Sequence, residues 1–160
     1  MAKSTRIEMY VVEDKPVNKL ELIIKDNGMK FDKLLMNNDD TYLKKTEPAL
    51  YFLKSNCKQI GGDFNMLSHN LSGNMISFTY PLKNKSRLPF GNGAAFLSTL
   101  FVSNPQIHFI YSQISQNGEF VFDSLRFINS FGAVDFEDKE FLFNLKQLIE
   151  VESTAIQEFA

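Results

Sequence analysis

The chain has 160 residues, of which 44% are hydrophobic and 22% charged, and its formal net charge is −2. This length is enough for one compact domain or two small ones. The acidic balance argues against nonspecific nucleic-acid binding, and no apolar stretch approaches the roughly 18 residues that a membrane-spanning helix needs. With one cysteine and therefore no internal disulfide, we expect a cytoplasmic protein that binds neither nucleic acid nor a membrane.

Alternating apolar and polar residues predict two strands at the start of the chain. The first covers residues 6–12, and the second covers residues 20–24 after a polar turn that contains a proline. We expect these strands to form a hairpin that ends at Asp26-Asn27-Gly28, a further turn signal. Residues 29–46 show no clean period, and we expect them to form a long surface loop.

The clearest helix is predicted over residues 47–60, where apolar residues recur at helical spacing. Thr46 can cap its start, and Gly61-Gly62 can stop it. Strands are expected at residues 63–68 and 75–80, on either side of a turn rich in Asn, Ser and Gly. These elements complete the first predicted unit.

The second half begins with a polar, Pro- and Gly-containing segment at residues 82–93, which we interpret as a linker. A short apolar helix should follow at residues 94–101, then a hairpin whose turn contains Gln116-Asn117-Gly118. The strands of this hairpin are predicted at residues 106–113 and 119–122. Two helices should follow, a capped one at residues 123–131 that ends at Gly132 and a second at residues 138–152.

The order of these elements predicts the fold class and the domains. We expect an α/β (α+β) two-layer sandwich at residues 1–81, in which a mixed β-sheet packs on helices. A small α+β C-terminal region should follow at residues 82–160. No internal repeat is visible.

The first half resembles the ATP-binding fold of the GHKL class, which is shared by gyrase, heat-shock chaperones, histidine kinases and mismatch-repair ATPases. More narrowly, the whole chain is similar to ATPase-like proteins associated with iron-only hydrogenases. The segments that carry the resemblance are LELIIKDNG, KSNCKQIGGDFNMLS and the tail SRLPFGNGAAFLSTLFVSNPQIHFIYSQISQNGEFVFD. Together they extend the resemblance over nearly all of the chain.

The resemblance implies the remains of an adenine site. Asp26, Asn27 and Gly28 match the start of the family's Asp-x-Gly-x-Gly motif, whose carboxylate meets the adenine amino group, but Lys30 replaces the second glycine. Asn74 falls near a family threonine that reaches the adenine. We therefore expect these four matching positions to form a residual adenine end. No cofactor is certain, and binding of ATP, ADP or adenosine should be weak.

The resemblance also implies a damaged phosphate end. The family's N-box helix supplies a Glu that activates water and an Asn that holds Mg²⁺, and the sequence begins at the strand that should follow this helix. Glu47, Pro48 and Ala49 stand where a glycine-rich lid should offer backbone N–H groups to phosphate. A carboxylate roughly 5 Å from one phosphate charge costs about 3 kcal/mol at an effective dielectric constant near 20. We therefore expect no catalytic residue and no ATPase or kinase activity.

The other polar residues fit structural roles better than a site. His69 and His108 lack partners at ligand spacing, so no metal site is expected. Cys57 lies on the apolar face of its predicted helix and should belong to the core. Acids of the predicted loops, such as Glu13 and Asp40, are expected to be solvated.

Two functions and a third interpretation remain open at this level. The chain can be a degenerate ATPase-like domain that acts as a non-catalytic interaction or regulatory module. Because the N-box helix is missing from the sequence, we expect the sheet to expose apolar surface to a protein partner or a second copy. The resemblance implies a redox or hydrogenase-linked setting for that module. Alternatively, the chain is an ATP-binding protein of the histidine-kinase/ATPase superfamily whose N-box comes from another chain or a missing upstream segment. A structural remnant without any ligand is the third interpretation.

Overall fold

The computed structural model describes residues 4–31, 33–37, 39–69, 73–86, 93–132 and 135–156. Its strands are β1 (Arg6–Asp14), β2 (Lys19–Asp26), β3 (Asp63–His69), β4 (Gly73–Pro81), β5 (His108–Ser115) and β6 (Gly118–Asp123). Its helices are α1 (Lys33–Met36), α2 (Asp40–Thr46), α3 (Pro48–Gln59), α4 (Gly93–Ser103), α5 (Ser124–Phe131) and α6 (Lys139–Ile156).

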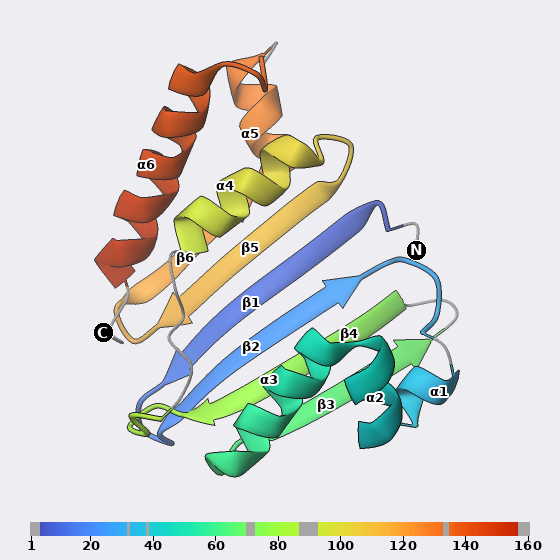
Figure 1. The fold of residues 1–160 in the computed structure, drawn as a ribbon. Coiled ribbons are helices and arrows are strands. Elements are labelled where there is room, and N and C mark those ends of the chain that lie inside the picture. The colour runs from blue at the N-terminus through green and yellow to red at the C-terminus, as the bar shows by residue number, and fades with distance from the viewer. Residues whose placement is uncertain are drawn as a thin grey trace.

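The strands form one mixed, six-stranded sheet in the order β3-β4-β2-β1-β5-β6 (Figure 1). Neighbouring strands are antiparallel except β1 and β5, which pair in parallel. The expected α+β sandwich, with a mixed sheet packed on helices, is therefore confirmed. Because β1 pairs with β5, the sheet continues across the predicted boundary between residues 81 and 82.

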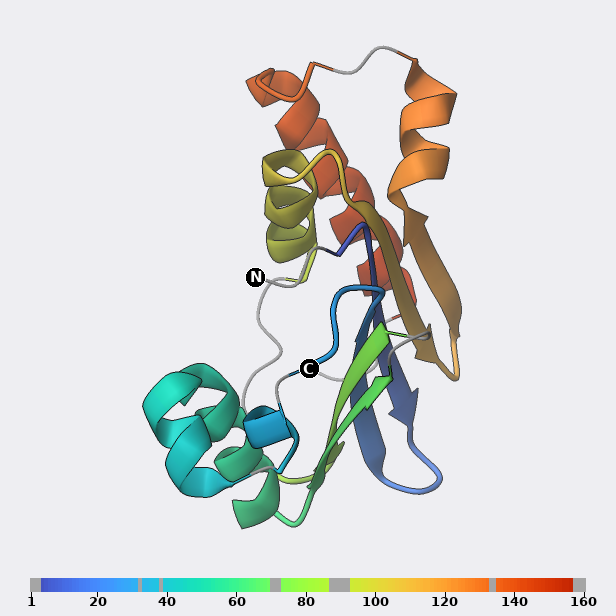
Figure 2. The same cartoon turned by 90° about the vertical axis from the view of Figure 1, so that its right-hand side faces the viewer.

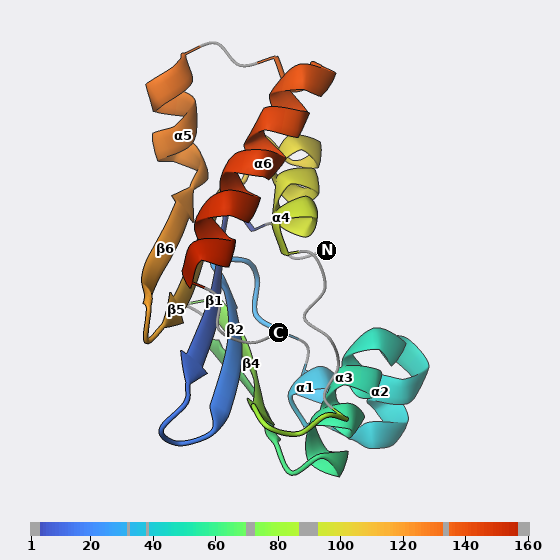
Figure 3. The ribbon, with the colours of Figure 1, turned by 90° about the vertical axis from the view of Figure 1, so that its left-hand side faces the viewer.

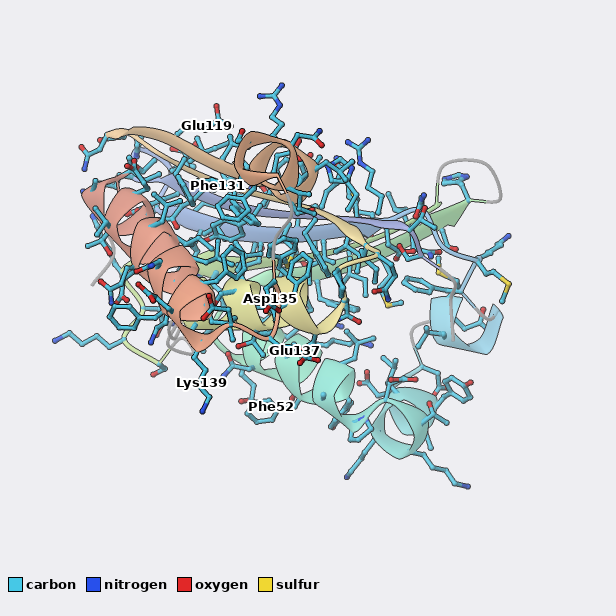
Figure 4. The ribbon with its side chains drawn as sticks, turned by 90° about the horizontal axis from the view of Figure 1, so that it is seen from above. Phe52, Glu119, Phe131, Asp135, Glu137 and Lys139 are labelled. Carbon is cyan, nitrogen blue, oxygen red and sulfur yellow. The ribbon has the colours of Figure 1, made fainter. Side chains whose placement is uncertain are left out.

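Side-chain alternation gives the sheet two different faces. The inner face is the one on which Val11, Leu22 and Phe78 lie in register on β1, β2 and β4. Helices α3, α4 and α6 pack on the inner face (Figure 2). The outer face carries charged pairs such as Arg6–Glu8, and Figure 4 shows Glu119 on this side, away from α3 and α4.

Two groups of helices cover the ends of the inner face. Helix α3 packs on β3 and β4, whereas α6 packs on α4, β5 and β6. The ring of Phe101 in α4 meets Phe122 of β6 with centroids 5.7 Å apart. Phe127 of α5 contacts both of these rings and Phe141 of α6, so an aromatic cluster closes the core at this end.

The long loop predicted at residues 29–46 is wrong, because the segment contains α1 and α2. Asp39 caps α2 by accepting hydrogen bonds from the backbone N–H groups of Thr41 and Tyr42. Leu43, which is fully buried, anchors this helix. Helices of one or two turns are too short to show a helical period, so the pattern of the sequence does not reveal them.

The predicted cap at Thr46 is also wrong. The Thr46 hydroxyl donates a hydrogen bond to the carbonyl of Tyr42 within α2. The N-cap position of α3 is occupied by Glu47, whose side chain makes no capping hydrogen bond. Helix α2 therefore leads directly into α3.

Several other local predictions are confirmed. Helix α3 falls within the predicted range, and its residue Cys57 is buried. Asp123 caps α5, which ends at Gly132 with a positive φ of 74°. The linker predicted at residues 82–93 lies partly outside the described residues. Among the described helices, none has the length and apolar character needed to cross a membrane.

Candidate functional site

A polar cluster of Asp26, Gly28, Ser68 and Asn74 lies on the inner face, beside α1. Strand register explains how it assembles, because Asn74 of β4 pairs with Asp26 of β2 on one side and with Ser68 of β3 on the other. Three strands thus bring three polar side chains into one row. The sequence predicts Asp26, Gly28 and Asn74 as members of one site, and the structure brings them together.

Asn74 is the centre of the polar cluster and is only 3% exposed. Its Nδ2 donates to Oδ1 of Asp26 at 3.0 Å and to the carbonyl of Met29 at 2.9 Å. Its Oδ1 accepts from the Ser68 hydroxyl and, at 3.3 Å, from the backbone N–H of Phe31. These four bonds use both donors and both lone pairs of the amide. Asn74 therefore acts as a structural hub.

Asp26 is half-buried, and its hydrogen bonds within the described residues all reach one oxygen. Oδ1 accepts from Asn74 and, at 2.7 Å, from the backbone N–H of Gly28. The second oxygen, Oδ2, receives no hydrogen bond from the described residues. That oxygen retains the capacity to accept one from a ligand amine.

Asn27 does not join the polar cluster, although the sequence predicts it there. Its Oδ1 accepts from the backbone N–H groups of Thr5 and Arg6, both at 2.9 Å, and its Nδ2 donates to the Thr5 hydroxyl at 2.8 Å. The side chain therefore fixes the start of β1. Conversely, Ser68 belongs to the cluster but had no sequence signal, because only strand register places it next to Asn74.

The predicted phosphate end offers few donors. The backbone N–H of Glu47 already donates to the carbonyl of Leu43 at 2.8 Å, because α2 continues into α3. Pro48, the first residue of α3, has no N–H group. Of the three residues that stand in place of the lid, Glu47 and Pro48 therefore provide no free N–H group for a phosphate.

An apolar cleft of about 420 Å³ opens on the inner face between α3 and α4. Its floor is formed by β1, β2, β4 and Tyr111 of β5, and its walls by Leu53 of α3 and by Gly93, Phe96 and Leu97 of α4. The strand residues that line it are Met9, Tyr10, Val11, Leu20, Leu22, Ile23, Ile24, Phe78 and Tyr80. Asp26 follows Ile24 on the same face of β2, about 7 Å further along the strand.

The apolar cleft is lined by uncharged groups. No charged side chain is among its described lining residues. Burial raises the pKa of Tyr80 and of Tyr111, so both phenols stay protonated at neutral pH. The Tyr111 hydroxyl donates to Oε1 of Gln113 at 2.9 Å, and the Tyr80 hydroxyl is hydrogen-bonded to the Cys57 thiol. The polar atoms of both rings are thus engaged inside the protein.

The apolar cleft exists because no described helix lies over the centre of the sheet. Figures 1 and 3 show α3 and α4 on the same side of the sheet, and no described helix lies over β1 and β2 between them. Ile24 on the floor is 41% exposed, and Phe96 on the wall is 59% exposed. This exposed apolar surface agrees with the expectation that part of the sheet lacks cover.

The charged groups outside the polar cluster have structural roles. Asp40 is exposed, as expected, and its carboxylate forms an ion pair of 2.6 Å with Lys54, which is buried on α3. The hydrogen bond from Lys54 lowers the pKa of Asp40. Glu13, also expected to be solvated, is buried in β1. The described residues contain no group of three or more His, Cys, Asp or Glu side chains suited to a metal ion.

The His108–Asp123 pair supports the start of α5. Oδ1 of Asp123 accepts from the backbone N–H groups of Leu125 and Arg126 and lies 3.0 Å from Nε2 of His108. Burial by itself raises the pKa of Asp123, but these hydrogen bonds and the neighbouring His108 outweigh it and lower the pKa. Asp123 is therefore the N-cap of α5, and His108 supports it.

Fold and site together define an α+β two-layer sandwich with an apolar cleft at the centre of its sheet and a polar cluster beside the cleft. No protein-family model matches the chain, and no curated protein matches it either.

Proposed function

We propose that the protein is a non-catalytic interaction module, a degenerate ATPase-like domain that binds a protein partner through the uncovered centre of its sheet. The observation that carries this proposal is the apolar cleft, in which Ile24 and Phe96 remain exposed. Contiguous exposed apolar surface is typical of interaction sites in proteins. The partner can be another protein or a second copy of the chain.

The polar groups near the apolar cleft support a role without catalysis. Asn74 has no donor or acceptor left for a ligand, and Asn27 is committed to the start of β1. Glu47 adds negative charge where a phosphate would need backbone donors. The resemblance of the tail to ATPase-like proteins associated with iron-only hydrogenases favours a partner from redox or hydrogenase-linked machinery.

A thiol reporter in the apolar cleft tests whether a partner covers it. Ile24→Cys places a thiol on the cleft floor, whereas Lys25→Cys places one on the outer face of the same strand. Native Cys57 is buried and its pKa is raised by burial, so it contributes little background. We expect a maleimide to label Ile24→Cys more slowly in an extract of the source cells than in buffer, with Lys25→Cys unchanged.

Light scattering measures the mass of the purified protein and shows whether the partner is a second copy of the chain. A monomeric mass at high concentration, together with equal labelling rates of Ile24→Cys in extract and buffer, contradicts the interaction module. Slower labelling at both positions would indicate a general effect of the extract.

The second candidate function is nucleotide binding, with the N-box supplied by another chain or an upstream segment. The observation that favours it is the assembly of Asp26, Gly28 and Asn74 into one cluster, with Oδ2 of Asp26 open to a ligand amine within the described residues. Calorimetric titration with adenosine, ADP and ATP, with and without Mg²⁺, tests it. An interaction module should bind adenosine no tighter than about 1 mM, or about −4 kcal/mol, and ATP more weakly still. Micromolar, Mg²⁺-dependent ATP binding would favour the second candidate.

A further inference from the structure

Asn-Gly is the dipeptide in which an asparagine side chain most readily reacts with the following backbone nitrogen, because glycine has no side chain that blocks the approach. The sequence contains this dipeptide at residues 27–28, 92–93 and 117–118. Asn92 lies outside the described residues. Asn27 and Asn117 are both exposed, so exposure does not distinguish these two positions. Their hydrogen bonds, however, are very different.

Both reacting groups of Asn27-Gly28 are held in place. The Asn27 carboxamide is fixed to the start of β1 by hydrogen bonds of 2.8–2.9 Å to Thr5 and Arg6. The backbone N–H of Gly28, whose nitrogen would have to attack that carboxamide, donates instead to Oδ1 of Asp26 at 2.7 Å. The reaction at Asn27 therefore requires a local opening that breaks several hydrogen bonds.

The Asn117 side chain lacks this restraint. Its carboxamide forms no hydrogen bond with the described residues, and only the backbone N–H of Asn117 donates, to Oγ of Ser115 at 3.0 Å. Residues 116–118 are all exposed in the turn between β5 and β6. Within the described part of the chain, the carboxamide can thus rotate towards the nitrogen of Gly118 without giving up a hydrogen bond.

The same turn is attached to the end of α6. Oγ of Ser115, which accepts from Asn117, donates in turn to the carbonyl of Ile156 at 2.6 Å. A Cβ atom at Gly118 would lie 3.6 Å from the side chain of Ile156. The carbonyl groups at the C-terminal end of a helix carry partial negative charge. A negative charge or a longer backbone in this turn would therefore disturb the docking of α6.

We propose that Asn117 is a site of spontaneous deamidation and that its conversion loosens the end of α6. The backbone nitrogen of Gly118 attacks Cγ of Asn117 and forms a new C–N bond. The proton of that nitrogen leaves with the carboxamide nitrogen as ammonia, and a cyclic succinimide remains. Water then opens either carbonyl of the ring, which gives aspartate or isoaspartate.

Both products affect the contact with α6. Each adds a carboxylate to the turn, and isoaspartate also lengthens the backbone by a methylene group. Residues 115–118 are not among the described residues that line the apolar cleft. The modification site is therefore independent of the proposed function.

Ageing of the full chain in neutral buffer tests the site, with the same chain in urea as the control. Peptide mass spectrometry follows the conversion of Asn27 and Asn117 in the same samples. In the folded protein we expect Asn117 to convert at least about tenfold faster than Asn27, because the hydrogen bonds of Asn27 must open first. In urea, where these bonds are absent, the two rates should agree within about threefold. Equal rates in the folded protein overturn the proposal, and so does an Asn117 that converts only in urea.

Hydrogen exchange tests the effect on α6. The control is Asn117→Gln, which keeps a carboxamide at the turn but reacts far more slowly, because its longer side chain must close a larger ring. After equal ageing, the backbone amides in the last turn of α6 should exchange at least about threefold faster in the native sequence than in Asn117→Gln. Equal exchange in the two proteins, once mass spectrometry shows that Asn117 is converted, rejects the loosening of α6.

Discussion

Nδ2 of Asn74 donates a hydrogen bond of 3.0 Å to Oδ1 of Asp26, across the pairing of β4 with β2. The two residues are 48 positions apart in the sequence. Because Asn74 also bonds to Ser68 and to the backbone at Met29, this contact ties the end of the first hairpin to the second one. The residues expected at an adenine site thus have a demonstrable structural role of their own.

Removing the Asn74 side chain should destabilise the fold strongly. Asn74→Ala deletes four hydrogen bonds at a buried position and leaves their partners without the amide. We expect a loss of about 2–4 kcal/mol in the free energy of unfolding, measured by urea denaturation. Asn65→Ala, at an exposed position of β3, is the matched control and should change stability by less than about 0.5 kcal/mol. Equal effects of the two substitutions would show that the polar cluster does not stabilise the fold.

Two glycines with the same backbone angle should respond differently to substitution. Gly73 and Gly61 have φ values of 79° and 81°, but a Cβ atom at Gly73 would lie 1.9 Å from the carbonyl oxygen of Asp26, whereas one at Gly61 meets nothing within 4 Å. Gly61→Ala should cost about 1–2 kcal/mol through backbone strain alone. Gly73→Ala should cost about 3 kcal/mol or more, because the β2–β4 contact must also shift. Thermal or urea unfolding measures both, and a similar cost at the two sites would contradict the close approach at Gly73.

Purified protein should release no phosphate from ATP above background. The physical reason is the environment of α3, where the N–H of Glu47 is already bonded to Leu43 and Pro48 has none. A malachite-green assay over several hours, with Asp26→Asn as the control for a contaminating ATPase, checks this expectation. Sustained turnover that disappears in Asp26→Asn would reject the non-catalytic assignment, whereas turnover that persists in this variant would indicate a contaminant.

The contribution of Asp123 to stability should depend on pH. Its folded-state pKa is lowered below the usual value, so the carboxylate stabilises the fold above about pH 4, the unfolded pKa, and this contribution is lost as pH falls through the lowered folded pKa. At pH 7, Asp123→Ala should lose about 1 kcal/mol because α5 loses its cap. Asp123→Asn retains a capping oxygen but not the charge, and its stability should fall less between pH 5 and pH 3 than that of the native protein. Parallel acid-dependence curves for the native protein and Asp123→Asn would contradict this cause.

Local features of the sequence determined several elements of the fold. The apolar spacing in α3, the capping Asp123 of α5 and the Asn117-Gly118 turn between β5 and β6 each depend on residues within a few positions of one another. The backbone preferences that form them are therefore visible in a short window. Three members of the polar cluster, Asp26, Gly28 and Asn74, were indicated instead by the resemblance to the GHKL fold, because no short window connects them.

Only the tertiary structure decided the features that depend on distant pairing. The parallel contact of β1 with β5 joins the two predicted units into one sheet, and the register of β3 on β4 brings Ser68 to Asn74. Helix α2 is held by buried Leu43 and by the Asp40–Lys54 ion pair. A helix of two turns is too short to show a helical period, so the sequence pattern predicts neither contact. The apolar cleft, likewise, follows from where α3 and α4 pack. Alternation along β2 predicts that Leu22 and Ile24 share a face, but whether a helix covers that face depends on contacts between residues far apart in the chain.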